Sequence, residues 1–297
     1  MNIASRVASA FRGTLSAVIL GAACALPAAA SGFIDWVTDD FEVLMNTSGQ
    51  VTFAPYVNGG SPRNDFEPGY RSEFFTYVDF FSWKGLISNW LIANSTIIER
   101  SDTTAFRLNR IRYTLTPGYR YEFDTWQISG LLLHECVHAI GEYEPDGSIW
   151  WNSFRFGFGS KGSYPQFLAE RYRKLKDPRS PLHHPGDKWD YQLNVGAFLY
   201  GAESIWLAQN NDYRYEQNAL FRYHIGRWGR WGSYADVNQY LWIREGGKTE
   251  QKWSVSANLL LVGRANIAGL YYTYVISDEN IVDNEDRLGS LGFKIVF

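Results

Sequence analysis

Hydrophobic and polar residues alternate with a period of two along most of the chain. From Trp189 to Tyr200 the odd-numbered positions are apolar or aromatic and the even-numbered positions are mostly polar, and the same alternation runs from Tyr213 to Ile225. Alternation of this kind predicts β-strands, because successive side chains of a strand point to opposite faces. The segments are about ten residues or longer, the length that a tilted strand needs to cross a membrane.

The two faces of these segments differ in a way that distinguishes a barrel from a soluble sandwich. The polar faces carry charged residues in mid-segment, such as Arg222 and Asp236, and the apolar faces begin or end with Trp or Tyr. A sandwich core could not bury such charges unpaired, whereas the hydrated interior of a barrel can hold them. We therefore expect an all-β fold over residues 49–297, a transmembrane antiparallel β-barrel of about twelve to fourteen strands with aromatic girdles. The uncertain strands are Gln50–Asn58 and Ser204–Asn210.

The predicted turns alternate in length. Short turns are expected at Lys161-Gly162, Gly201-Ala202 and Arg264-Ala265, and longer polar loops at Ala139–Ser148, Lys174–Lys188 and Asp278–Asp286. Short periplasmic turns and longer surface loops are typical of outer-membrane barrels.

The first thirty residues predict a cleaved export signal. Arg6 and Arg12 precede a short apolar run, Leu15–Leu26, and Ala28-Ala29-Ala30 offers a small-residue cleavage site. The apolar run is shorter than the roughly 20 residues of a transmembrane helix. Cys24 leaves a lipidated N-terminus open as an alternative. Residues 31–48 lack clear alternation and are expected in the periplasm or as a plug in the barrel.

Composition narrows the partners. The formal net charge is −3 without a basic block, so nucleic acid is not an expected partner. After cleavage one cysteine, Cys136, is left, so no disulfide within the chain is expected. We expect outer-membrane lipids as partners, and leave the oligomeric state open.

The final strand, Leu288–Phe297, places Leu291, Phe293, Ile295 and Phe297 on one face and ends on phenylalanine. It resembles the C-terminal strand by which outer-membrane barrels are recognised for assembly. This resemblance implies the barrel-assembly machinery as a partner and the bacterial outer membrane, in the cell envelope, as the location.

The densest group of chemically active residues lies between His134 and Glu142. His134-Glu135-x-x-His138 matches the zinc-protease motif, in which two histidines on successive helix turns bind zinc and the Glu activates water. If the segment is a strand, the two histidines are about 13 Å apart and cannot share one zinc ion. The methionine turn of the longer zinc-protease motif is also missing, because the two methionines, Met1 and Met45, both lie upstream.

On a strand, the same residues predict a site for acyl transfer. His134, Cys136 and His138 would share one face, and a histidine beside a nucleophile can act as a general base. The order His-x-nucleophile, loop, Trp-Asn resembles outer-membrane phospholipase A. The resemblance implies that His134 is the base, Cys136 stands at the position of the serine nucleophile, and Asn152 orients the base.

The segment also resembles an uncharacterised group of Gram-negative envelope proteins with His-x-Ser-Ser-His-Leu-Gly-Asp-Glu-Tyr, from which this chain keeps His134, His138, Glu142 and Tyr143. That resemblance supports a barrel and implies no activity. A third interpretation is that His134, Cys136, His138 and Glu142 are polar residues of the barrel interior or rim, bonded to neighbouring side chains.

The direction of His134 is open, because the apolar positions change from even to odd numbers near Gly130, where a bulge is expected. On the next strand Phe154, Phe156 and Phe158 predict a lipid face, which Asn152 shares.

Five arginines are expected in the lumen, and these would favour anions if the barrel conducts: Arg110, Arg112, Arg120, Arg214 and Arg222. The first functional hypothesis is a structural, pore-like or ligand-binding barrel. The alternative is a lipid acyl-ester hydrolase with His134, Cys136, His138 and Glu142 as candidate catalytic residues, and a zinc metalloprotease is the third. No cofactor or metal site is expected, although a hydrolase could use a divalent cation.

Overall fold

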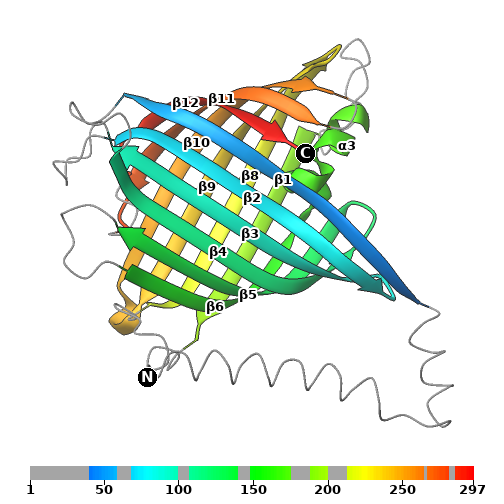
Figure 1. Cartoon of the computed structure of the whole chain (residues 1–297), viewed down its shortest axis with the longest axis horizontal. Helices are drawn as coiled ribbons and strands as arrows, with labels where there is room; N and C mark the ends of the chain where they lie inside the picture. The colour runs from blue at the N-terminus through cyan, green and yellow to red at the C-terminus, as the bar shows by residue number, and fades with distance from the viewer. Residues whose placement is uncertain are drawn as a thin grey trace, which may run out of the picture. The chain divides into compact units, whose positions relative to one another are not determined.

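The chain, described here from a computed structural model, forms a closed antiparallel β-barrel of twelve strands among the residues that the structure describes (Figure 1). These residues are 40–58, 68–99, 107–139, 148–174, 188–199, 213–263, 266–280 and 285–297. Neighbouring strands follow one another in the sequence, and β1 meets β12 to close the ring. The predicted fold class is confirmed, with the lowest of the expected strand numbers. The strands are β1 (Phe41–Asn58), β2 (Pro68–Trp83), β3 (Leu86–Glu99), β4 (Arg107–Glu122), β5 (Trp126–Ala139), β6 (Ser148–Ser160), β7 (Trp189–Phe198), β8 (Tyr213–Trp228), β9 (Trp231–Arg244), β10 (Thr249–Val262), β11 (Ile267–Asp278) and β12 (Gly289–Val296).

The first strand begins earlier than the sequence pattern indicates. β1 starts at Phe41, so residues 41–48, which show no clear alternation, belong to a strand. Their location in the periplasm stays a prediction. The expected export signal, residues 31–39 and the uncertain strand at Ser204–Asn210 lie outside the described residues. Residues 40–42 and 82–84 form a small unit of their own, in which the Lys84 amide donates to the Asp40 carbonyl at 3.2 Å.

The barrel has an apolar outer surface and a polar interior. Phe156 and Leu270 on the outer surface are 48% and 58% exposed, whereas Lys252 and Asp278 inside are 7% and 1% exposed. This is the reverse of a soluble globular protein, in which apolar side chains are the ones removed from water. The interior charges are paired, as Lys252 Nζ and Asp278 Oδ2 are at 3.1 Å. Alternation along each strand therefore separates a surface suited to lipid from a polar lumen.

One bulge changes the predicted face of a residue. The register of β8 against β9 shifts between Tyr213 and Tyr215. Tyr213 therefore points into the lumen, where its hydroxyl donates to Glu250 at 2.7 Å, while Tyr215 is exposed outside. The alternation predicted both tyrosines on the outer face, and this is wrong for Tyr213 because an extra residue in one strand reverses the side chains beyond it.

The two ends of the barrel differ in their connections. Short turns at residues 123–125 and 229–230 lie at one end, which we call the short-turn end. β5 and β11 end, and β6 and β12 begin, at the opposite end, which we call the loop end. The C-terminus lies at the short-turn end (Figure 1). There the Phe297 amide donates to the Gly49 carbonyl at 3.0 Å, and the Gly49 amide donates to the Phe297 carbonyl at 2.9 Å, which extends the closing pair of strands.

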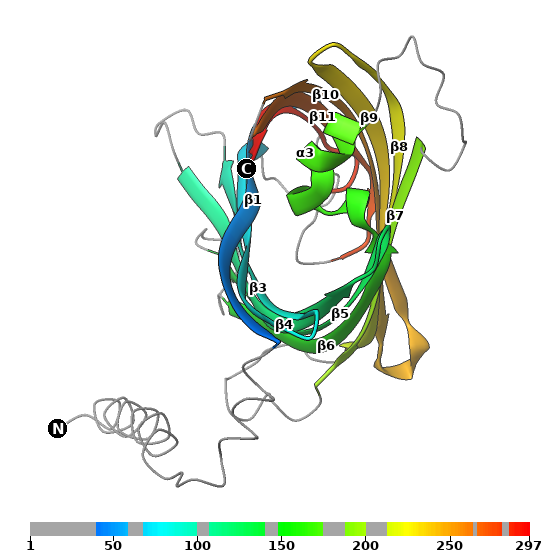
Figure 2. The same cartoon turned by 90° about the vertical axis from the view of Figure 1, so that its right-hand side faces the viewer.

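A helix fills part of the lumen at the short-turn end. The expected short turn at Lys161-Gly162 is instead the start of η2 (Lys161–Ser163), which leads into α3 (Pro165–Lys174), and α3 lies inside the ring of strands (Figure 2). Pro165 at the first helical position favours this helix start. None of the described helices is long and apolar enough to span a membrane.

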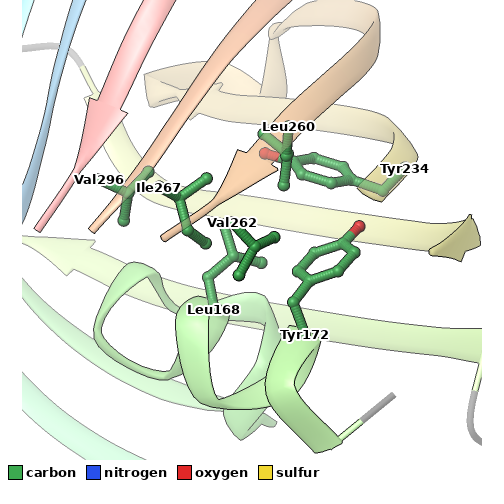
Figure 3. Packing of buried hydrophobic residues seen from close by; sticks show 7 residues of the cluster. All are labelled: Leu168, Tyr172, Tyr234, Leu260, Val262, Ile267 and Val296. Carbon is green, nitrogen blue, oxygen red and sulfur yellow. The ribbon is translucent and has the colours of Figure 1, made fainter. Parts of the chain in front are cut away.

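The inner face of α3 packs on the barrel wall. Leu168 and Tyr172 are four residues apart, so they lie on one side of the helix, and both are almost fully buried (Figure 3). They contact Tyr234 of β9 and apolar residues near the strand ends, Leu260, Val262, Ile267 and Val296. Arg227 holds the helix from the wall, donating from Nη1 to the Tyr172 carbonyl at 2.5 Å. The lumen is therefore narrowed by a packed helix at this end.

Candidate functional site on the outer face

The histidine-rich part of β5 faces outward. Leu132, two residues before His134, is 50% exposed on the outer surface, whereas Leu133 and Val137 are 3% exposed and face the lumen. Because side chains of a strand alternate, His134, Cys136 and His138 lie on the outer face with Leu132. β5 starts at the short-turn end, so these three residues lie in its half nearer the loop end.

The expected bulge at Gly130 is absent. The register of β5 against β6 runs without a shift from Trp126 to His138. The apolar residues change faces for a different reason: Val137 packs inside the lumen against Trp151, Tyr213 and Trp242. Part of the interior is apolar, so an apolar position on β5 does not by itself indicate the lipid face.

Neighbouring strands add two residues to this face. His134 is opposite Asn152 of β6, and Cys136 is opposite Tyr113 of β4. We call His134, Cys136, His138, Asn152 and Tyr113 the outer-face site. The rings of Tyr113 and His138 meet edge to face, with centroids 6.0 Å apart. All five residues come from the three adjacent strands β4, β5 and β6, so the barrel wall itself positions them.

A hydrogen bond joins the predicted base to the predicted orienting residue. His134 Nδ1 is 2.8 Å from Asn152 Oδ1. An amide oxygen only accepts, so the proton of this bond belongs to Nδ1, and Nε2 carries the lone pair of the ring. A histidine held in this tautomer is prepared to take a proton through Nε2.

Cys136 is the next residue after His134 on the same face. It is a free cysteine, 9% exposed, and Tyr113 stands opposite it. Alternate residues of a strand are about 7 Å apart, so Cys136 is the nucleophilic side chain next to His134 on this face. The outer-face site therefore combines a positioned imidazole with a nearby sulfur nucleophile.

The zinc-protease hypothesis is wrong. His134 and His138 lie on a strand, not on successive turns of a helix. Four residues along a strand separate their side chains by about 13 Å, too far for both to bind one ion at about 2 Å. The described part of the chain also contains no group of three or more His, Cys, Asp or Glu residues arranged to hold a metal. Glu142 lies outside the described residues.

The arginines expected in the lumen are largely paired with carboxylates. Arg112 is 3.4 Å from Glu135, Arg120 contacts Asp79 and Glu122, and Arg222 is 2.8 Å from Asp236. Arg214 pairs at 2.7 Å with Glu245, which is exposed in η4 (Glu245–Gly247). Arg110 is half-buried on β4.

A second histidine cluster is buried in the lumen and was not predicted. His224 of β8, which is fully buried, has Nε2 2.6 Å from Asp190 of β7 and Nδ1 3.2 Å from the Tyr172 hydroxyl of α3. Arg171 of α3 also pairs with Asp190, at 3.3 Å. The sequence signal was the polar face of His224, but only the docking of α3 brings the three groups together. His224 is buried, and its contacts, together with the Arg171–Asp190 pair, fix α3 to the barrel wall.

The fold and the outer-face site define a closed antiparallel β-barrel with a polar lumen and chemically active residues on its apolar outer surface. No protein-family model and no curated protein sequence matches the chain, so the resemblance to the envelope family stays a prediction.

Several solved outer-membrane β-barrels are similar to this chain in structure. The outer membrane phospholipase A from Escherichia coli has 10% sequence identity and a TM-score of 0.46, with 85% of this chain and 92% of that chain covered. An outer membrane channel from Pseudomonas putida F1 has 12% identity and a TM-score of 0.40, with 87% and 97% covered. The NanC porin has 8% identity and a TM-score of 0.40, with 84% and 97% covered. A phospholipase, a channel and a porin have all been solved with barrels of this kind, so these likenesses leave the function of this chain undetermined.

Proposed function

We propose that the chain is a bacterial outer-membrane protein that hydrolyses acyl esters of lipids at the outer surface of its barrel. The apolar outer face supports the membrane location, as does a set of exposed aromatic residues near the short-turn end, the usual composition of an interfacial girdle: Tyr119, Tyr121, Trp189, Trp228 and Trp231.

The observation that carries the proposed activity is the 2.8 Å hydrogen bond between His134 Nδ1 and Asn152 Oδ1. It orients a general base on the outer face, two residues from Cys136. If His134 were a structural residue bonded inside the lumen, its side chain would lie on the opposite side of the strand. A lipid that surrounds the barrel can reach the outer face without entering the lumen, which makes a lipid ester the fitting substrate class.

The chemistry is a two-step acyl transfer. The Cys136 sulfur attacks the ester carbonyl while its proton passes to His134 Nε2, and the intermediate collapses by breaking the bond to the alcohol oxygen. That oxygen takes the proton from His134, which leaves an acyl thioester on Cys136. Water then attacks the thioester carbonyl and gives a proton to His134. The fatty acid leaves, and the proton returns to the sulfur.

The position of the site along the barrel indicates which lipids it contacts. His134, Cys136 and His138 lie towards the loop end. In outer-membrane barrels the longer loops face the cell exterior, so the site would lie in the outer leaflet. His138 stands between Cys136 and the loop end and would contact the polar part of the lipid, while Tyr113 lies level with Cys136 on the neighbouring strand.

The direct test is hydrolysis of a phospholipid in mixed micelles by the refolded barrel. We expect His134→Ala to reduce the rate by about 10²- to 10⁴-fold, the usual contribution of a general base. Cys136→Ala should abolish hydrolysis, while Cys136→Ser should keep part of it because a hydroxyl can replace the thiol as nucleophile. A parallel assay with a chelator asks whether a divalent cation takes part.

The matched control is His224→Gln, which changes a histidine of the lumen that touches no part of the outer face. Its hydrolysis should stay within a few-fold of wild type if it folds, as judged by heat-dependent gel mobility. Equal rates in wild type, His134→Ala and Cys136→Ala would contradict the proposed function.

A further inference from the structure

Two connected cavities occupy the lumen between α3 and the loop end. Their volumes are about 420 and 350 Å³, within the usual size of small-molecule sites. Both are lined by Asn238 and Tyr240, so they form one space, which we call the lumen chamber. The larger of the two, which we call the lower cavity, is lined by Ser163 and Pro165 at the start of α3, and we call the smaller one the upper cavity. The helix inside the ring of strands thus forms the floor of the chamber (Figure 2).

A row of amide side chains crosses one wall of the chamber. Asn194 of β7 donates to Asn218 of β8 at 3.2 Å, and Asn218 donates to Asn238 of β9 at 2.8 Å. We call these three residues the asparagine ladder, and all three line the lower cavity. Each amide carries both donors and acceptors, as a ligand hydroxyl does. The ladder can therefore exchange hydrogen bonds with several hydroxyl groups of one ligand.

An aromatic surface continues from the ladder along β9. Asn238, Tyr240 and Trp242 are alternate residues on the lumen face of this strand, and the rings of Tyr240 and Trp242 are nearly parallel, at 10°, with centroids 5.6 Å apart. Trp151, which packs in one cluster with Trp242, also lines the upper cavity, and its buried indole N–H has no acceptor within the described part of the chain. A buried donor without an acceptor is costly, and a ligand oxygen in the cavity would satisfy it.

The charges of the chamber compensate one another. Among the described residues, six basic and five acidic side chains line the two cavities. Arg155 pairs with Glu216 at 2.5 Å, and Lys252 with Glu285 at 2.6 Å. Ion pairing therefore reduces the positive charge that the arginines of the chamber present to an anion. Lys294, which also lines the lower cavity, is hydrogen-bonded to Tyr234 and Asn258. That the five arginines named from the sequence favour anions stays a prediction.

We propose that the lumen chamber binds a neutral polyhydroxylated ligand, a sugar or short oligosaccharide. A pyranose ring has an apolar C–H face that fits an aromatic plane such as Tyr240 and Trp242, and its hydroxyls match the asparagine ladder. The proposal concerns the interior of the barrel and does not depend on hydrolysis at the outer face.

Other ligand classes fit the chamber less well. A fatty acyl chain would need an apolar lining, whereas the ladder presents a wall of amides. A metal ion would need clustered carboxylate, histidine or cysteine ligands, and the described residues contain no such group. An anion would compete with carboxylates already paired to the basic residues.

The test is isothermal titration calorimetry of the full barrel in a detergent without a sugar headgroup, with maltotriose as the neutral probe and glucuronate and inorganic phosphate as anionic probes. We expect saturable binding of maltotriose. Trp242→Leu should weaken it about tenfold, because a stacked aromatic contact is lost. Asn218→Leu should weaken it about three- to tenfold through lost hydrogen bonds.

Trp231→Leu is the matched control, because Trp231 is 50% exposed on the outer surface. It should bind maltotriose as wild type does, with folding checked by heat-dependent gel mobility. No saturable binding of maltotriose, tighter binding of glucuronate or phosphate than of maltotriose, or equal effects of Trp242→Leu and Trp231→Leu would each overturn the proposal.

Discussion

The hydrogen bond from His134 to Asn152 joins directly opposed residues of two neighbouring strands. Cross-strand partners are held by the sheet, so the imidazole is oriented before any substrate arrives. Orientation of a base by a neighbouring acceptor is the arrangement on which acyl-transfer sites depend. At the scale of single residues, the proposed role of His134 as a base therefore depends on Asn152.

Replacing Asn152 should expose its role as a positioning residue. We expect Asn152→Ala to lower the rate of lipid ester hydrolysis by about 10- to 100-fold, since the base is kept but its tautomer is no longer held. Asn152→Asp, which keeps an acceptor oxygen, should restore part of the rate and change the pH profile. Asn194→Ala, in the lumen, serves as the control and should hydrolyse normally. Loss of activity in Asn194→Ala as large as in Asn152→Ala would refute the positioning role.

Buried and exposed ion pairs of this chain should contribute different amounts to the free energy of unfolding. Glu216→Gln removes the negative charge that pairs with Arg155, and the Glu216 side chain is only 6% exposed. The substitution should lower the free energy of unfolding by about 3–5 kcal/mol, because the charge of Arg155 is then left uncompensated. Glu245→Gln removes the negative charge that pairs with Arg214, and the Glu245 side chain is 68% exposed. This substitution should lower the free energy of unfolding by at most about 1 kcal/mol. Urea unfolding in lipid vesicles measures both. Equal losses would show that the lumen is solvated like the protein surface.

At the scale of elements, α3 is the piece that sets this barrel apart from an open pore. Its inner face is packed by Leu168 and Tyr172, and Tyr172 is further held by His224. Arg222 reaches the segment before the helix, donating to the Gly162 carbonyl at 3.1 Å. Several independent contacts thus keep the helix inside the barrel, and we expect wild type to conduct weakly in planar bilayers.

A single methyl group should loosen this helix. A Cβ at position 232 would collide with the Tyr172 ring, so Gly232→Ala should weaken the docking of α3 by about 1–3 kcal/mol. We expect a higher ion conductance of the variant in planar bilayers. Gly130→Ala is the control, since its Cβ would make only an ordinary contact at 3.9 Å with Phe154. Unchanged conductance in Gly232→Ala would mean that α3 does not limit the passage of ions.

At the scale of the whole molecule, the barrel closes where the two ends of the described chain meet. Phe297 extends the β1–β12 pair through its two hydrogen bonds with Gly49. Closure satisfies the edge strands, which could not stay unpaired in a lipid environment. Phe297 therefore contributes to closure of the barrel. Recognition of the final strand by the assembly machinery stays a prediction.

Deletion of Phe297 should lower the amount of assembled barrel in the outer membrane, measured by heat-dependent gel mobility of membrane fractions. Phe156→Ala is the matched control, because Phe156 is an exposed phenylalanine on the outer face of β6, away from the final strand. We expect its assembly to stay near wild type. Equal assembly of the deletion and of wild type would remove the proposed role of the C-terminal residue.

The alternation of side chains was enough to predict the barrel. Long alternating strands with charged residues in the middle of one face and aromatic residues at the ends of the other are typical of a barrel in a membrane, and β7 and β12 could be placed from their sequences almost to the residue. His134, Cys136 and Asn152 could be grouped before the structure because their order along the chain resembles that of outer-membrane phospholipase A.

Only the tertiary structure decided which way those residues point and what occupies the lumen. The face of a strand depends on its register with its neighbours and on what lies behind it: a bulge reversed Tyr213, and an apolar cluster in the lumen decided the faces around Val137, which the sequence left open. The docking of α3 joins residues that are far apart in the sequence, and the pairing of Arg222 with Asp236 and the asparagine ladder depend on the register of neighbouring strands. Docking and register follow from how the strands and the helix pack together, which no local pattern of residues encodes.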